Sequence, residues 1–237
     1  MHVHTCLSPC GDLEMSPQKI AAQAQRVNMG IIAICDHNSA ENVPAVTRAG
    51  DLRDLVVLPG MEICSREEIH VLAIFESLDP AFEMQSKLYA HLPGKNDPDA
   101  FGLQVVANEN DEVVLLEDRL LIGAVDLPVE VIVSEIHRLG GAAIASHVDR
   151  GSFSVISQLG FIPDALKFDA LELSSNIREG EAKERFAQYS RFPFIRNSDA
   201  HFLKDVGKNT CEYVLDRPTF GEILKALRRE DGRKVCE

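Results

Sequence analysis

The stretch Ile31-Ile32-Ala33-Ile34-Cys35-Asp36-His37-Asn38 joins a run of apolar residues to an acid and a histidine. Consecutive apolar positions are typical of a strand that is buried on both faces, as in a parallel sheet. In parallel α/β folds the carboxyl ends of the strands meet on one face, and that face carries the chemistry. The stretch therefore predicts a buried sheet with a functional site where its strands end.

Similar apolar runs recur along the chain, with helical patterns between them. The predicted strands are Ile31–Cys35, Leu55–Leu58, His70–Phe75, Ala142–Ser146, Ala170–Leu173, Phe194–Asn197 and Glu212–Leu215. A helix is predicted from Ser16-Pro17 to Gly30, and others over Pro128–Leu139, Glu181–Tyr189 and Thr219–Arg228. This alternation favours an α/β barrel or a doubly wound sheet.

One segment interrupts the alternation. Two apolar runs, Leu103–Ala107 and Glu112–Leu116, flank the polar residues 108–111, which indicates a β-hairpin. We interpret residues 80–126 as an insertion within a single domain that spans residues 1–237. The insertion either covers the site and influences substrate choice or is a passive surface hairpin.

Composition limits the possible partners. The chain has 24 basic and 37 acidic residues, so its net charge is −13, which argues against a long nucleic-acid track. It does not exclude a nucleotide that is held through metal ions. Apolar runs are too short for a membrane span, and no signal peptide is visible, so we expect a cytoplasmic protein. The six cysteines are expected to be reduced, and Cys6 and Cys10 give only a weak indication of a zinc-thiolate site.

Six of the eight histidines lie at the ends of strand-like runs, with carboxylates close to them in sequence. These histidines are His2, His4, His37, His70, His147 and His201, and the acids include Asp36, Glu62 and Asp199. Imidazole and carboxylate together are the ligands of Zn, Mn or Fe. The pattern predicts a metal centre, whereas His91 and His137 are expected to be ordinary residues.

This order of residues resembles the PHP family (polymerase and histidinol phosphatase domains). The matching blocks are His2-Val3-His4-Thr5 with Ser8 and Asp12, Asp36-His37-Asn38, Gly60-Met61-Glu62, His70, His147 and Asn197-Ser198-Asp199-Ala200-His201. The resemblance implies a distorted (β/α)7 barrel, which is TIM-like, with two or three divalent ions (Zn, Mn or Fe) on its carboxyl-terminal face. Family members usually carry a strand before the first histidine. Because only Met1 precedes His2, we expect either a stub of a strand or a natural start further upstream.

The resemblance also implies a ligand set. The first metal would take His2, His4, Glu62 and Asp199; the second would share Glu62 and add His70 and His147; the third would take Asp12, His37 and His201. Glu62 would then bridge two ions, and Asp12 or His201 could serve as the general acid. Asp36 would orient a ligand from behind.

The implied activity is hydrolysis of a phosphoester by a metal-activated hydroxide. Arg150 and Arg178 follow strand ends and are candidates for binding the substrate phosphate. We expect a phosphatase that acts on a small phosphorylated metabolite or nucleotide, similar to histidinol phosphatases. The alternatives are an exoribonuclease-like or oligonucleotide phosphodiesterase and a non-catalytic metal-binding module. The sequence does not indicate the oligomeric state.

Overall fold

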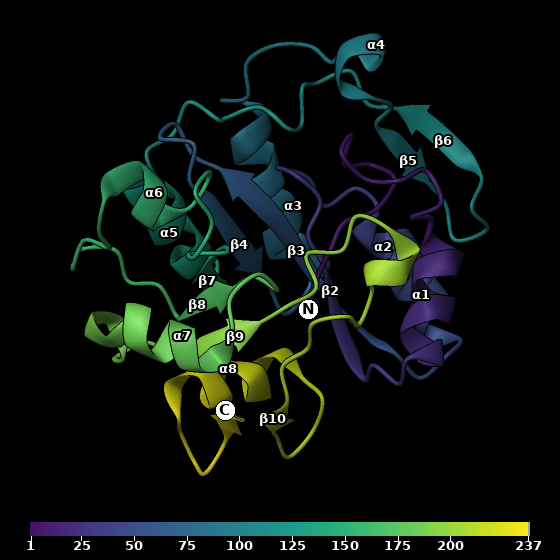
Figure 1. Cartoon of the computed structure of the whole chain (residues 1–237). Coiled ribbons are helices and arrows are strands. Elements are labelled where there is room, and N and C mark those ends of the chain that lie inside the picture. The colour runs from purple at the N-terminus through teal and green to yellow at the C-terminus, as the bar shows by residue number, and fades with distance from the viewer. Residues whose placement is uncertain (237) are drawn as a thin grey trace.

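The computed structural model describes residues 1–236, and its centre is a curled seven-stranded sheet (Figure 1). The strand order is β1 (His2–Val3), β2 (Ile31–Ile34), β3 (Val56–Cys64), β4 (His70–Ile74), β7 (Ala142–Ala145), β8 (Ala170–Leu173) and β9 (Phe194–Arg196). Beyond β9 the chain returns to β1, where the amide of His4 donates to the carbonyl of Ala200 at 3.0 Å. The segment after the last strand therefore lies beside the first strand, and the sheet curls into a barrel-like shape.

Strand β4 departs from the expected parallel arrangement. It pairs antiparallel with both β3 and β7, whereas the other neighbouring strands of the large sheet are parallel. The expectation is wrong here because only residues 65–69 separate β3 from β4, and a parallel connection needs about a dozen residues or more. As a result, the amino end of β4 lies beside the carboxyl ends of the other strands. His70 reaches the site for this reason, although it begins its strand.

The interior of the barrel changes character along the strands. Its apolar part includes Ala33, Cys35, Leu58, Leu72, Ile74, Ala142, Ile144, Ala170 and Ile195. Side chains two residues apart on a strand share a face. The same inward face therefore continues from Cys35 to His37, from Leu72 back to His70, and from Ala170 to Glu172. One end of the interior is apolar, and the other carries ionisable groups.

Helices cover the outside of the sheet and close its apolar end. The outer helices are α1 (Pro17–Arg26), α2 (Val43–Asp51), α3 (Leu78–Tyr89), α5 (Val129–Arg138), α6 (Val155–Leu159) and α7 (Glu179–Arg185), with short helices η1 (Ala187–Tyr189) and η2 (Leu203–Asp205). Helix α8 (Phe220–Arg228) packs Phe220, Ile223 and Leu227 against the interior apolar cluster. Beside it lies a small sheet of β10 (Tyr213–Val214) and β11 (Lys234–Val235). Within residues 1–236, no helix is both long and apolar enough to cross a membrane.

The segment 80–126 has two structurally different parts. Its first part belongs to α3, whose Ala81, Met84 and Leu88 lie in the main core. Further along, α4 (Pro98–Phe101) precedes an antiparallel hairpin of β5 (Val105–Ala107) and β6 (Val113–Leu116). The turn of this hairpin is fixed to α1, because Asp111 accepts hydrogen bonds from the Ser16 hydroxyl at 2.7 Å and the Gln18 amide at 2.8 Å. Figure 1 shows the hairpin beside α1 and α2, apart from the large sheet.

Candidate metal centre

Glu62 is the centre of the polar end of the barrel. Its side chain is buried on β3, and its two oxygens lie 3.2–3.6 Å from ring nitrogens of five histidines: His2, His4, His37, His70 and His147. These histidines come from β1, the ends of β2 and β7, and the start of β4. The curled sheet thus converts positions that are distant in sequence into one cluster around a single carboxylate.

Asp199 brings a second carboxylate to the same cluster. Its Oδ1 lies 3.4 Å from Nε2 of His2, 3.3 Å from Nε2 of His4 and 3.6 Å from Nδ1 of His201. The residues of the cluster form three overlapping groups, and within each group every residue has one ligand atom no more than 4.8 Å from those of the others. The groups are His2, His4, Glu62 and Asp199; His37, Glu62 and His70; and His4, His37 and His201. This arrangement of imidazole and carboxylate suits a divalent metal ion.

Hydrogen bonds behind His2 and His4 determine which nitrogen each ring turns toward the cluster. Nδ1 of His2 lies 3.1 Å from a Glu172 oxygen and donates to that carboxylate. Nδ1 of His4 lies 2.9 Å from the Ser8 hydroxyl, which itself donates to Asp36 at 2.7 Å. Both Nδ1 atoms therefore carry hydrogen, and both Nε2 atoms face the cluster, only 3.0 Å apart. Asp36 acts on His4 through Ser8, as a residue that orients a ligand from behind would.

The charges and burial of the cluster shift the pKa values of the neighbouring His2 and His4 in opposite directions. Burial and the nearby His201 lower the pKa of His4 to about 4. Burial also opposes a charge on His2, but the carboxylates of Glu172, Asp199 and Glu62 outweigh it and hold the pKa of His2 well above its ordinary value. The surrounding histidines keep the pKa of Glu62 well below its usual range despite burial. This raised pKa favours a protonated His2 before any ion binds, and the 3.0 Å between the two Nε2 atoms fits a proton that His2 donates to His4.

Unsatisfied atoms test whether the cluster fits a metal. Buried polar atoms without a hydrogen-bond partner are rare in folded proteins and need a specific reason. Four such atoms face another ligand of this cluster: Nδ1 of His37, Nδ1 of His70, Oε1 of Glu62 and Oδ1 of Asp199. Lone pairs on nitrogen and carboxylate oxygen that face one another repel unless a cation lies between them. The residues present therefore fit one or more divalent ions.

Some predicted site residues lie elsewhere. Asp12 is in none of the three groups that the described residues form, because its Oδ1 accepts from the Glu14 amide at 2.8 Å and so stabilises a turn. Arg178 is exposed at the N-cap of α7, with no described contact to the cluster. Arg150 does reach the cluster, since its guanidinium lies 2.6 Å from Oδ2 of Asp199 while 38% of its side chain stays exposed.

Glu172 was not predicted from the sequence to lie at the site, and Cys10 was only weakly indicated as half of a zinc-thiolate pair with Cys6. Buried Glu172 on β8 contacts His2, accepts from the Asn197 amide group at 2.7 Å and from the His147 backbone amide at 3.1 Å. The signal in the sequence was an acid inside the apolar run Ala170–Leu173. Cys10 lies with its sulfur 3.3 Å from Nε2 of His37, whereas the Cys6 sulfur faces the Val105 carbonyl. The two cysteines therefore contact different groups.

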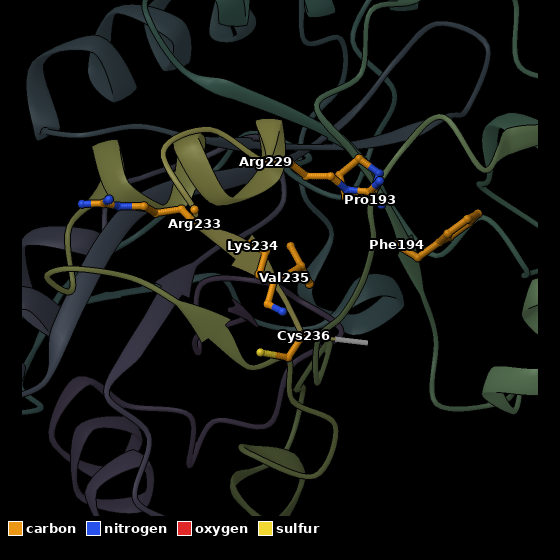
Figure 2. Close-up of a pocket in the computed structure, with 8 residues that line it drawn as sticks. Pro193, Phe194, Arg229, Arg233, Lys234, Val235 and Cys236 are labelled. Carbon is orange, nitrogen blue, oxygen red and sulfur yellow. The ribbon is translucent and has the colours of Figure 1, made fainter.

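The other ionisable features of the molecule are separate from the cluster. Nε2 of His137 pairs with Asp169 at 2.9 Å, and exposed His91 contacts the Lys87 carbonyl. A cavity of about 640 Å³ lies beside α8 and β11, at the amino end of β9 (Figure 2). Arg233 contributes to its lining, but that guanidinium also donates to Glu222 at 2.7 Å. The cavity is at the opposite end of β9 from Asp199 and His201 and contains no histidine.

Comparisons with known proteins agree with this geometry. A family model described as PHP-associated matches residues 178–231, which include Asp199 and His201. The fold is similar to that of the lesion-specific endonuclease PfuEndoQ from Pyrococcus furiosus, with a TM-score of 0.76 and 20% identity over 99% of this chain and 56% of that one. Together, the family match and the similar fold support a PHP-type domain in this chain.

Two further proteins resemble the PHP-type domain. One is a candidate metal-dependent phosphoesterase from Bifidobacterium adolescentis, with a TM-score of 0.58 and 18% identity over 84% of this chain and 86% of that one. The other is the uncharacterized protein YqxK of Bacillus subtilis, which is 29% identical over 106 residues, or 43% of this chain and 27% of the relative. The chain thus spans about half the length of the endonuclease and about a quarter of the Bacillus protein.

The expectation of a small phosphorylated partner without a nucleic-acid track is wrong. Endonuclease Q in complex with a 27-mer duplex that carries an abasic lesion matches 99% of this chain with a TM-score of 0.75 and 20% identity. The net charge gives only a sum and not the distribution of charge: Glu62, Glu172 and Asp36, for example, are buried and paired inside the barrel.

The shared proton between His2 and His4 leads to a first prediction. Metal binding at Nε2 requires a deprotonated nitrogen. Because the raised pKa of His2 favours its protonated form, we expect binding of Mn²⁺ or Zn²⁺ to the metal-free chain to release about one proton per chain. Calorimetry in two buffers of different ionisation enthalpy measures this release. Equal heats in both buffers would show that His2 is already neutral and that its electrostatic description here is incorrect.

Proposed function

We propose that this chain is a metal-dependent phosphodiesterase that cleaves nucleic acid. The observation that carries the proposal is the carboxylate of Glu62 within 3.6 Å of five histidine rings, with its Oε1 lacking a hydrogen-bond partner. The folds that resemble the chain support a phosphoester substrate, and the duplex bound by Endonuclease Q supports nucleic acid in particular.

In this proposal the cluster residues hold two or three divalent ions, such as Mn, Zn or Fe. His2, His4, Glu62 and Asp199 would hold one ion, Glu62 with His70 and His147 a second, and His37 with His201 a third. Bound ions would lower the pKa of a water molecule and neutralise phosphate oxygens. The remaining chemistry would be done by the chain itself, which would position the diester in line with that water and supply a proton to the leaving oxygen.

In a two-ion centre, where His201 is not a ligand, it is the better candidate for that proton. Its Nδ1 contacts the Asp199 backbone carbonyl at 3.0 Å, which orients the ring and leaves Nε2 for the cluster or the substrate. The ring stacks on that of His4 with centroids 4.2 Å apart, and 24% of its side chain is exposed. Asp12 is less suitable because one of its oxygens is already occupied in a turn.

Arg150 supplies a cation beside the ions, and its exposed guanidinium edge could bind a nonbridging phosphate oxygen. We expect Arg150→Ala to lower kcat/KM for a DNA or RNA oligonucleotide by about 10- to 100-fold, because a charge-assisted hydrogen bond to phosphate is lost. Arg178→Ala is the matched control, since this exposed arginine has no described contact to the cluster, and we expect less than a twofold change. Equal effects of the two substitutions would contradict the role of Arg150.

The basic test of the proposal is an oligonucleotide cleavage assay. We expect the purified chain to cut single-stranded or duplex oligonucleotides when Mn²⁺ is present, and to lose this activity when a chelator is added. Lesion-containing and intact duplexes should be compared in the same assay. Failure to cut any oligonucleotide with Mn²⁺, Zn²⁺ or Fe²⁺ would reject the proposal.

A further inference from the structure

The loop between β7 and α6 contains an aromatic residue, Phe153, that does not pack in an apolar cluster of the described residues. Phe153 adopts a φ of 56°, in the left-handed region that a bulky residue rarely occupies. Its carbonyl accepts from the backbone amide of His70 at 2.9 Å. The ring stacks on the imidazole of His70, with centroids 4.8 Å apart and planes at 28°. The backbone is thus held in an unfavourable conformation that keeps this ring against a residue of the metal cluster.

Packing does not explain the ring. An apolar residue just before a helix cap commonly packs against the fourth helical residue. Ser154 caps α6 through the Ser157 amide, so the fourth helical residue is Gln158, which is polar. Phe153 belongs to none of the apolar clusters among the described residues, and 41% of it is exposed. The ring stacks on His70, and the residue remains accessible to a molecule that approaches from solvent.

Other residues of the same loop contact the metal cluster. The loop begins at His147, which contacts Glu62, and continues through Arg150, which contacts Asp199. A ligand of the cluster, a cation for phosphate and an exposed aromatic ring are therefore presented by one short connection. Successive bases of a nucleic acid stack on aromatic side chains, whatever their identity, while the backbone is held by cations.

We propose that Phe153 is a stacking platform for a base of the nucleic-acid substrate next to the metal cluster. The proposal rests on the proposed function and adds to it that the site grips an unstacked nucleotide. Phe153 would increase the affinity for the nucleic acid and help to determine where along the nucleic-acid strand cleavage occurs. The ring does not take part in bond breaking.

The kinetic test compares Phe153→Leu with Phe153→Tyr on a series of oligonucleotides. Each oligonucleotide of the series lacks the base at one position, and this position differs from one oligonucleotide to the next. On intact oligonucleotide we expect Phe153→Leu to lower kcat/KM by about 5- to 100-fold, mainly through KM, and Phe153→Tyr to restore most of the loss. At one position of the series, the penalty of Phe153→Leu should disappear because there is no base to stack. An equal penalty on every abasic substrate would reduce Phe153 to a support for His70 and overturn the proposal.

A binding test is independent of cleavage. The chain contains no tryptophan, so Phe153→Trp introduces the only indole. We expect its fluorescence to be quenched saturably when the metal-loaded variant is mixed with oligonucleotide, measured by stopped flow before turnover. The control is Phe161→Trp, at the other end of α6, where 58% of the residue is exposed. Quenching confined to Phe153→Trp supports the platform even in a chain that fails to cut; no quenching, or equal quenching in both variants, overturns it.

Discussion

Replacing Glu62 by alanine is expected to abolish metal-dependent cleavage, with a loss on the order of a thousandfold or more. The carboxylate lies among histidines from β1, β2, β4 and β7, and both of its oxygens face them. Its removal deletes the ligand that two ions would share. It also leaves the histidine rings facing one another without the negative charge that holds them together. Cleavage of an oligonucleotide and metal content by mass spectrometry are the two measurements.

Two variants separate a local effect from misfolding. Glu62→Gln keeps the shape of the side chain and removes its charge, so we expect it to fold and still lose most activity. Glu76→Ala is the control carboxylate, because exposed Glu76 follows the far end of β4 and should keep full activity. Near wild-type turnover in folded Glu62→Ala would exclude the cluster as the catalytic centre.

The second large effect is expected for Glu172→Gln. This buried carboxylate accepts from His2, Asn197 and the His147 amide. Glutamine has only one oxygen, so its NH2 would face either the Asn197 amide group or the His147 backbone amide, and both of these are donors. Breaking a buried charged pair on one side costs about 3–5 kcal/mol of unfolding free energy. Loss of a group that orients a metal-bound histidine typically weakens metal affinity about 10- to 100-fold. We therefore expect lower stability and weaker metal binding together.

The matched control for Glu172 is a carboxylate with ion pairs at the surface. Glu135 on α5 pairs with Lys87 at 3.1 Å and with Arg138 at 2.9 Å. Such exposed pairs contribute about 0–1 kcal/mol, so Glu135→Gln should leave metal affinity unchanged and stability nearly so. Urea unfolding and calorimetric metal titration of both variants provide the comparison. If Glu172→Gln bound metal as tightly as the wild type, Glu172 would not orient His2.

The sequence predicted the ionisable end of the barrel well, and for a clear physical reason. His37, Glu62 and Asp199 each follow an apolar run, and the carboxyl ends of parallel strands meet on one face. This rule indicated that the three residues lie close together before the strand order was known. It gives no direction for Asp12, because the side chain of a turn residue is oriented by local hydrogen bonds such as the one from the Glu14 amide.

The fold was predicted less completely where long-range pairing decides it. The antiparallel position of β4 depends on a short connection whose effect appears only when the sheet is assembled. Helix α3 was not predicted, because residues from 80 onward were interpreted as an insertion, although its apolar side chains belong to the main core. Glu172 was missed since one acid in an apolar run gives no partner; His2 lies 170 residues away in the sequence.

The most direct test of the central claim is a metal titration of chelator-stripped protein, with oligonucleotide cleavage and bound metal measured in the same samples. We predict no cleavage without metal. Activity should rise as Mn²⁺ is added and reach its plateau at two or three bound ions per chain, and Glu62→Ala should fail to reach it. Full cleavage by the stripped protein, or a plateau with fewer than two bound ions per chain, would contradict the assignment of the histidine and carboxylate cluster as a metal-dependent catalytic centre.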